Sequence, residues 1–160
     1  MTLAPLLTAP PIIQLHVIAV ILALILGPLA MLRRSRDIWH KLLGRGWLLA
    51  MAVTALSSFL ITDIRLIGRF SPIHILSVLT LFSLWQGVAH ARAGRIGLHR
   101  QTMLSLYTYA IGIAGVFTLL PGRRMSDVLF GAASWTGFFG MAILLLAVII
   151  WQRHRATPAQ

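Results

Sequence analysis

The sequence contains no cysteine, and this absence removes several kinds of chemistry at once. Without thiols the chain forms no disulfide, offers no thiolate to a metal and cannot attach haem covalently through cysteine. A cysteine nucleophile is excluded for the same reason. Any metal or cofactor must therefore be held by histidine, aspartate, methionine or backbone groups.

Charged side chains are also scarce, at 11% of residues, and only three of them are acidic. With 58% hydrophobic residues and a mean hydropathy of +0.86, the composition is far from that of a soluble globular domain. The chain has no glycine-rich phosphate loop, no paired carboxylates of a hydrolase and no HExxH motif. The chemistry of soluble enzymes is therefore not indicated, and whether the protein is an enzyme stays open.

Five long stretches without a charged residue fill most of the chain, and each is long enough to cross a bilayer as a helix. They cover residues 12–32, 46–62, 70–91, 101–122 and 128–152. A segment in lipid must satisfy its own backbone hydrogen bonds. We therefore predict an all-α fold, an integral membrane bundle of about five transmembrane helices that forms a single domain over residues 1–160.

Lysine and arginine are distributed unevenly between alternate sides of these stretches. One side has ten of them: Arg33, Arg34, Arg36, Lys41, Arg45, Arg92, Arg95, Arg100, Arg153 and Arg155. The other side has four: Arg65, Arg69, Arg123 and Arg124. The positive-inside rule then predicts a bacterial inner (cytoplasmic) membrane protein with its N-terminus outside and its C-terminus in the cytoplasm. The lipid bilayer accounts for the net charge of +11, so we expect no binding of nucleic acid.

The five tryptophans are expected in two kinds of place. Trp39, Trp47 and Trp151 fall at the cytoplasmic ends of the predicted spans, where aromatic rings anchor a membrane protein. Trp85 and Trp135 lie deeper, and we expect them to pack between helices.

Histidine is the most informative residue type, because an ionisable side chain at membrane depth is costly unless it faces the bundle and has a partner. His16 and His74 each lie four residues into a stretch that starts at the predicted outer face. We expect both at one depth. His40 in the first loop, His90 at the end of the third stretch and His99 before the fourth stretch form a second group near the inner face.

Two interpretations of these histidines stay open. In the first, paired imidazoles bind haem b, with His16 and His74 at the outer level and His99 with His40 or His90 at the inner level. In the second, the inner histidines contact lipid headgroups, and the outer two bond each other or water. No residue is predicted to be catalytic.

Asp63 ends the second stretch on the predicted outer side. If the helices pack in chain order, its carboxylate lies near His16 and His74, and the three together form a metal site or a proton relay. The alternative is an interfacial ion pair with Arg65.

A set of motifs resembles a known family. The set comprises His16, Gly27-Pro28, His40-Lys41, Gly44-Arg45, His74, His99-Arg100, Met103 and Tyr107. It is similar to a bacterial family of predicted membrane proteins of unknown function, over roughly residues 12–125. This resemblance implies a multi-span helical membrane protein and no particular activity.

The helix-end histidines are also similar, more loosely, to those of di-haem b-type cytochromes and ferric-reductase-like bundles. That resemblance implies haem b and electron transfer. Such bundles place two histidines of one helix on one cavity, whereas His74 and His90 are 16 residues apart and thus turned by about 160° from each other. Haem pairs in this chain would therefore join histidines from different helices.

The sequence thus predicts an integral membrane protein with three candidate functions. The first is a haem-binding electron-transfer module, and the second is a non-catalytic scaffold or accessory subunit. The third is a transporter of metal ions or small solutes, against which the lack of an inverted repeat counts. We expect a membrane protein partner or a second copy of the chain, and the sequence does not identify an electron donor.

Overall fold

The computed structural model describes residues 3–33, 36–61, 72–131 and 135–156, and every regular element in these ranges is a helix. The prediction of an all-α fold is confirmed for this part of the chain. The chain divides into two units, Ala9–Tyr107 and a second unit made of Met1–Thr8 with Thr108–Gln160. The single domain stays a prediction.

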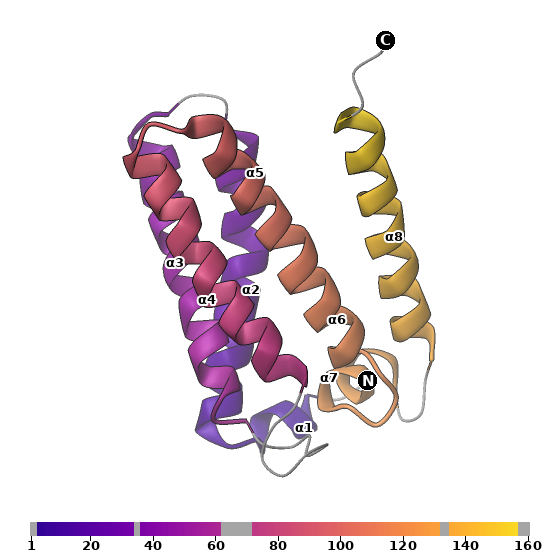
Figure 1. Ribbon diagram of the computed structural model, residues 1–160. Helices are drawn as coiled ribbons and strands as arrows, with labels where there is room; N and C mark the ends of the chain where they lie inside the picture. Colours follow the sequence, from indigo (N-terminus) through magenta and orange to yellow (C-terminus); the bar gives the residue numbers. More distant parts are fainter. Residues whose placement is uncertain (1–2, 34–35, 62–71, 132–134, 157–160) are drawn as a thin grey trace. The chain divides into compact units, whose positions relative to one another are not determined.

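Four helices form the first unit, which we call the four-helix unit. They are α2 (Pro11–Leu32), α3 (Ile38–Ser58), α4 (Pro72–Arg92) and α5 (Ile96–Leu106). The last three each pack on the helix before them in the chain, and successive helices of the four run in opposite directions (Figure 1). Both the α2–α3 junction and the α4–α5 junction therefore lie at one end of the unit.

Small residues form the packed face of α2. Ala19, Ala23, Gly27 and Ala30 are buried, whereas most of the leucines and isoleucines of the same helix are exposed. A soluble helix shows the opposite arrangement, because water drives its large apolar side chains inward. In lipid, small residues let backbones approach closely while large side chains face the acyl chains.

Two described helices are both long and apolar enough to cross a membrane, Pro11–Leu32 and Ile73–Arg92. The helix Thr136–Gln152 is apolar but shorter. In α3 the charges of Lys41 and Arg45 lie in the first turns and shorten the uncharged part. The helical bundle agrees with the expected membrane fold, and the number of five spans stays a prediction.

The second unit contains α1 (Ala4–Leu7), α6 (Gly112–Thr118), α7 (Arg124–Phe130) and α8 (Thr136–Ala156). A π-helical turn, η1 (Tyr107–Ile111), precedes α6. Glycines bring α6 close to α8, since a Cβ at Gly112 would lie 2.4 Å from a methyl group of Leu145. The Gln152 amide donates a hydrogen bond of 2.7 Å to the Thr108 hydroxyl, which is consistent with antiparallel packing.

The stretch 128–152, predicted as one span, is not one continuous helix. Residues 128–130 belong to α7, which ends at Gly131. Gly131 has φ +82°, a left-handed conformation that a glycine adopts without strain and that ends helices. The next described helix begins at Thr136.

The predicted places of three tryptophans are wrong. Trp47, expected at the interface, is only 2% exposed, whereas Trp85 and Trp135, expected between helices, are 66% and 54% exposed. The reason for the first error is that α3 begins at Ile38, so Trp47 is already in its third turn. There its ring packs against Gly27, the position on α2 where the absence of a Cβ leaves room.

Candidate functional site

His16 links α2 to α3 near one end of the four-helix unit. Its Nδ1 lies 2.8 Å from the Ser57 hydroxyl, which itself donates a hydrogen bond of 3.1 Å to the Thr54 carbonyl. If the single hydroxyl proton points to Thr54, Nδ1–H of His16 is the donor to Ser57. A neutral ring that donates from Nδ1 carries its lone pair on Nε2.

His74 links α4 to the same end of α3. The side chain is 6% exposed, and its Nε2–H donates a hydrogen bond of 3.3 Å to the Ser58 carbonyl. Its ring stacks on Phe59, with centroids 5.5 Å apart and planes inclined by 16°. The Ser58 and Ser77 hydroxyls are also bonded to each other, at 2.5 Å. The predicted outer histidines therefore both contact the last turn of α3, at Ser57 and Ser58.

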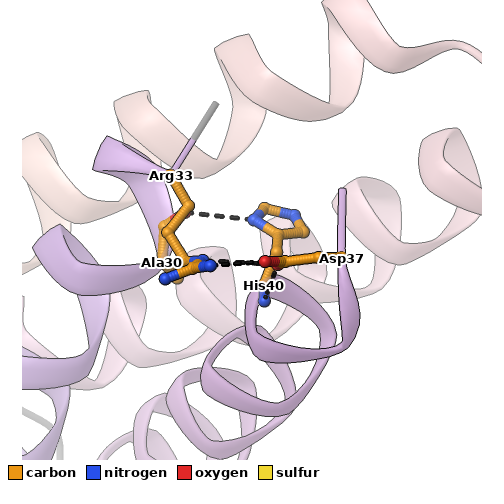
Figure 2. Close-up of polar contacts among 4 residues, drawn as sticks. All are labelled: Ala30, Arg33, Asp37 and His40. Atoms are coloured by element: carbon orange, nitrogen blue, oxygen red, sulfur yellow. Dashed lines mark hydrogen bonds and ion pairs between the residues drawn. The ribbon is translucent and has the colours of Figure 1, made fainter. Parts of the chain in front are cut away.

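His40 links the start of α3 back to the end of α2, as Figure 2 shows. Its Nδ1–H donates a hydrogen bond of 3.1 Å to the Ala30 carbonyl, one of the last carbonyls of α2, which have no partner within that helix. The structure places His40 in the first turn of α3, so the prediction that it lies in a loop is wrong.

Asp37 contacts both helices at the α2–α3 junction. One carboxylate oxygen accepts the backbone N–H of His40 at 2.9 Å and so caps α3, and the carboxylate also pairs with Arg33 at the end of α2 (Figure 2). The hydrogen bond to Asp37 raises the pKa of Arg33, so this guanidinium stays charged at every pH of interest.

His99 links α5 to α4 at the same end. Its Nδ1–H donates a hydrogen bond of 2.8 Å to the Gly87 carbonyl. Met103, one turn further along α5, lies over the same glycine, because a Cβ at Gly87 would lie 1.8 Å from the Met103 methyl group. Gly87 is therefore the point where α5 approaches the backbone of α4.

Each neighbouring pair of helices in the four-helix unit thus has a bridging histidine, at one of two levels. On α2, Ala30 comes 14 residues after His16, and on α3, Ser57 comes 17 residues after His40. At 1.5 Å per residue the two levels are about 20–25 Å apart along the helices. The two groups of histidines predicted from the sequence lie at opposite ends of this unit.

A further contact lies between the two levels of histidines. It involves the motif residues Gly27-Pro28 and Tyr107. Pro28 has no N–H, so the Leu24 carbonyl lacks its partner within α2. The Tyr107 hydroxyl donates a hydrogen bond of 3.2 Å to this carbonyl. Gly27 provides the space, since a Cβ there would lie 2.5 Å from the Tyr107 ring and 2.9 Å from Nε1 of Trp47. Sequence reasoning did not find this contact, although Pro28 implied an acceptor without a partner.

Two of the predicted site residues are not joined to these bridges. His90 has a buried Nδ1 with no hydrogen-bond partner in the part of the chain that the structure describes. Asp63, the third residue of the proposed metal site, lies outside the described residues, as does Arg65. Among the described side chains, no three His, Asp or Glu form a group able to hold a metal ion. A haem site needs only two histidines.

Comparison with curated proteins finds no match, and comparison with solved structures finds none either. A family model described as "Predicted membrane protein (DUF2306)" matches residues 13–122. This range contains all four bridging histidines and the contact between Tyr107 and Leu24. The chain therefore belongs to the DUF2306 family of predicted membrane proteins.

Proposed function

We propose that the protein is an electron-transfer module of the bacterial inner membrane that binds haem b. His16 and His74 would hold one haem, and His40 and His99 the other. Haem iron supplies one-electron oxidation and reduction when bound. The single observation that carries the proposal is the form of the histidine bridges: the rings of His40 and His99 each donate Nδ1–H to a backbone carbonyl, and His16 is bonded to Ser57 through the same ring nitrogen.

This hydrogen-bonding pattern favours ligation for a physical reason. A histidine that binds a metal through Nε2 almost always donates its other ring N–H to a carbonyl, carboxylate or water. The bond fixes the tautomer and the direction of the ring before the ligand arrives. For His40 and His99 the acceptors are the backbone carbonyls of Ala30 and Gly87, which cannot change their role by rotating a proton.

The same reasoning selects His40 over His90 as the inner partner of His99. The buried Nδ1 of His90 has no acceptor among the described residues, so no hydrogen bond from this nitrogen holds the ring in a ligating orientation. The outer pair requires one change. His74 now directs Nε2–H to the Ser58 carbonyl, and its ring must turn away from this oxygen before Nε2 is available to iron.

The orientation is part of the proposal. The α2–α3 and α4–α5 junctions, with the inner histidines, face the cytoplasm, because most of the lysines and arginines lie there. A module of this kind exchanges electrons with a membrane protein partner or with a second copy of the chain. The exposed large apolar residues of α2 and α4, such as Ile21, Leu29, Ile75 and Val78, offer surface for lipid or for such a partner.

The proposal is tested by the absorbance spectrum of protein purified in detergent from cells supplied with a haem precursor. We expect a Soret band that shifts on reduction with dithionite, and about two haems per chain by the pyridine haemochrome assay. A colourless protein with the helical circular dichroism of the folded chain would refute the proposal.

His40→Asn and His99→Asn separate ligation from helix packing. An asparagine amide keeps an N–H donor close to the place of Nδ1 but has no equivalent of Nε2. We expect each variant to remain folded and to lose the inner haem. His90→Asn is the matched control, and we expect its haem content to equal that of the parent protein.

A second candidate function is that of a non-catalytic membrane scaffold, and the bond of His74 favours it. A ring that donates Nε2–H to a carbonyl already uses this nitrogen to join two helices. In a scaffold, His74→Asn and His16→Asn would alter only stability, and no variant would alter an absorbance spectrum.

A further inference from the structure

Besides Arg33, six basic side chains among the described residues lie at the junction end of the four-helix unit. They are Arg36, Lys41, Arg45, Arg92, Arg95 and Arg100, and all six are exposed. They come from two chain segments that the antiparallel packing of α3 and α4 brings to one end. In the described part of this unit, every lysine and arginine lies at or near this end.

Among the described residues of this unit, no acidic side chain is available to neutralise this group. Asp37 is the one acidic residue among the described residues of the unit, and its carboxylate already accepts from Arg33 and from the backbone N–H of His40 (Figure 2). Arg33 thus pairs with this carboxylate, and the six positive charges named above have no acidic partner among the described residues of the unit.

Apolar side chains lie beside the charges on the same helix. Lys41 and Arg45 are one turn apart on α3, and Ile38, Trp39 and Leu42 are exposed, with Trp39 57% exposed. A surface that combines cations, an exposed indole and exposed aliphatic side chains matches a headgroup attached to acyl chains, rather than a soluble anion.

We propose that this end of the four-helix unit is a binding surface for anionic phospholipid, with the six basic side chains contacting phosphate and the exposed apolar residues of α3 contacting acyl chains. The proposal does not depend on haem. Binding of anionic phospholipid at this surface would be a specific requirement of this protein, beyond the general preference of basic loops for one side of a membrane.

The test uses the full chain purified in detergent and stripped of lipid. Phosphatidylglycerol is added, with phosphatidylcholine and glycerol 3-phosphate as controls, and bound lipid is counted by native mass spectrometry while thermal unfolding is followed by circular dichroism. We expect phosphatidylglycerol to bind and to raise the unfolding temperature, and the two controls to have little effect. An equal effect of phosphatidylcholine, or of glycerol 3-phosphate, would overturn the assignment to an anionic lipid.

Variants locate the surface. Each basic residue near an anionic surface contributes about fivefold to binding, so Lys41→Gln with Arg45→Gln should weaken phosphatidylglycerol binding at least tenfold. Arg123→Gln with Arg124→Gln, in the second unit, is the matched control and should bind like the parent protein. If the two double variants lose binding equally, the proposed location is wrong. Should the α3 variant not fold, Arg92→Gln with Arg95→Gln tests the other segment of the same surface.

Discussion

The hydrogen bond between Tyr107 and Leu24 allows a test of how this bundle is held together. Because residue 28 is proline, the Leu24 carbonyl has no donor within α2, and the Tyr107 hydroxyl at 3.2 Å takes that role. Tyr107→Phe removes the hydroxyl and keeps the ring that packs against Gly27. It leaves a carbonyl without a partner in a region where lipid offers no substitute donor.

The expected loss of stability follows from two known ranges of hydrogen-bond energy. A carbonyl left without a partner costs about 1–3 kcal/mol, while interhelical hydrogen bonds in membranes average about 0.6 kcal/mol and reach about 1.7. We therefore expect Tyr107→Phe to lower the free energy of unfolding by about 1–1.5 kcal/mol. In a Pro28→Ala background the backbone N–H of the alanine bonds to the Leu24 carbonyl. Tyr107→Phe should then lower the free energy of unfolding by only a few tenths of a kcal/mol.

The four proteins of this double-mutant cycle are compared by reversible unfolding in mixed micelles, followed by circular dichroism. The expected result is a coupling energy of about 1 kcal/mol between positions 28 and 107. If Tyr107→Phe is equally destabilising with proline and with alanine at position 28, the hydroxyl does not compensate for the proline, and our account of this contact is wrong.

Three further predictions concern the same unit. Gly27→Ala should destabilise the protein by about 1–3 kcal/mol, because the new methyl group meets two rigid rings. Gly87→Ala should destabilise it less, since the flexible end of Met103 is able to move. Thermal unfolding of the two variants measures the difference. Asp37→Ala should cost about 0.5–2 kcal/mol through loss of the α3 cap, and Asp37→Asn should recover most of it, as chemical unfolding will show. For haem, His99→Asn should remove one of two redox transitions in a spectroscopic titration, and two unchanged transitions would contradict the inner site.

The helices themselves could be predicted from the sequence, because long uncharged stretches have few alternatives in a membrane. The common level of His16 and His74 along the bundle also followed, since helical rise converts a residue number into a distance along the helix. His16 and His74 were expected at one level, and both contact the last turn of α3. These inferences needed only the positions of residues along one helix.

The errors arose where the end of a helix was inferred from charge. The charge of Arg45 predicts that the second span starts at residue 46, but α3 starts earlier, at Ile38, with Asp37 as its cap. Charged residues within the first turns of a helix lie near headgroups without ending the helix. His40 therefore belongs to α3 instead of a loop, and Trp47 is deep enough to be buried.

The partners of the histidines could not have been predicted, because they depend on rotation about the helix axes. The sequence gives the place of Gly87 along α4, but not that its carbonyl faces His99 on the next helix. Pro28 is different. It implied that Leu24 needs a donor, but only the register of α5 and the following π turn selects Tyr107 over the serines and threonines nearby.

Ligation and helix packing do not exclude each other in this protein. A bond from Nδ1 to a backbone carbonyl stabilises the contact between two helices, and the same bond directs Nε2 away from that carbonyl. His40 and His99 would therefore be retained at these positions by a structural role alone, and a haem would need no new bond to orient them. For this reason an alanine variant cannot separate the two roles, because it removes both nitrogens together. Asparagine removes only the ligand nitrogen, so a variant that stays folded and loses its Soret band would assign the second role to Nε2.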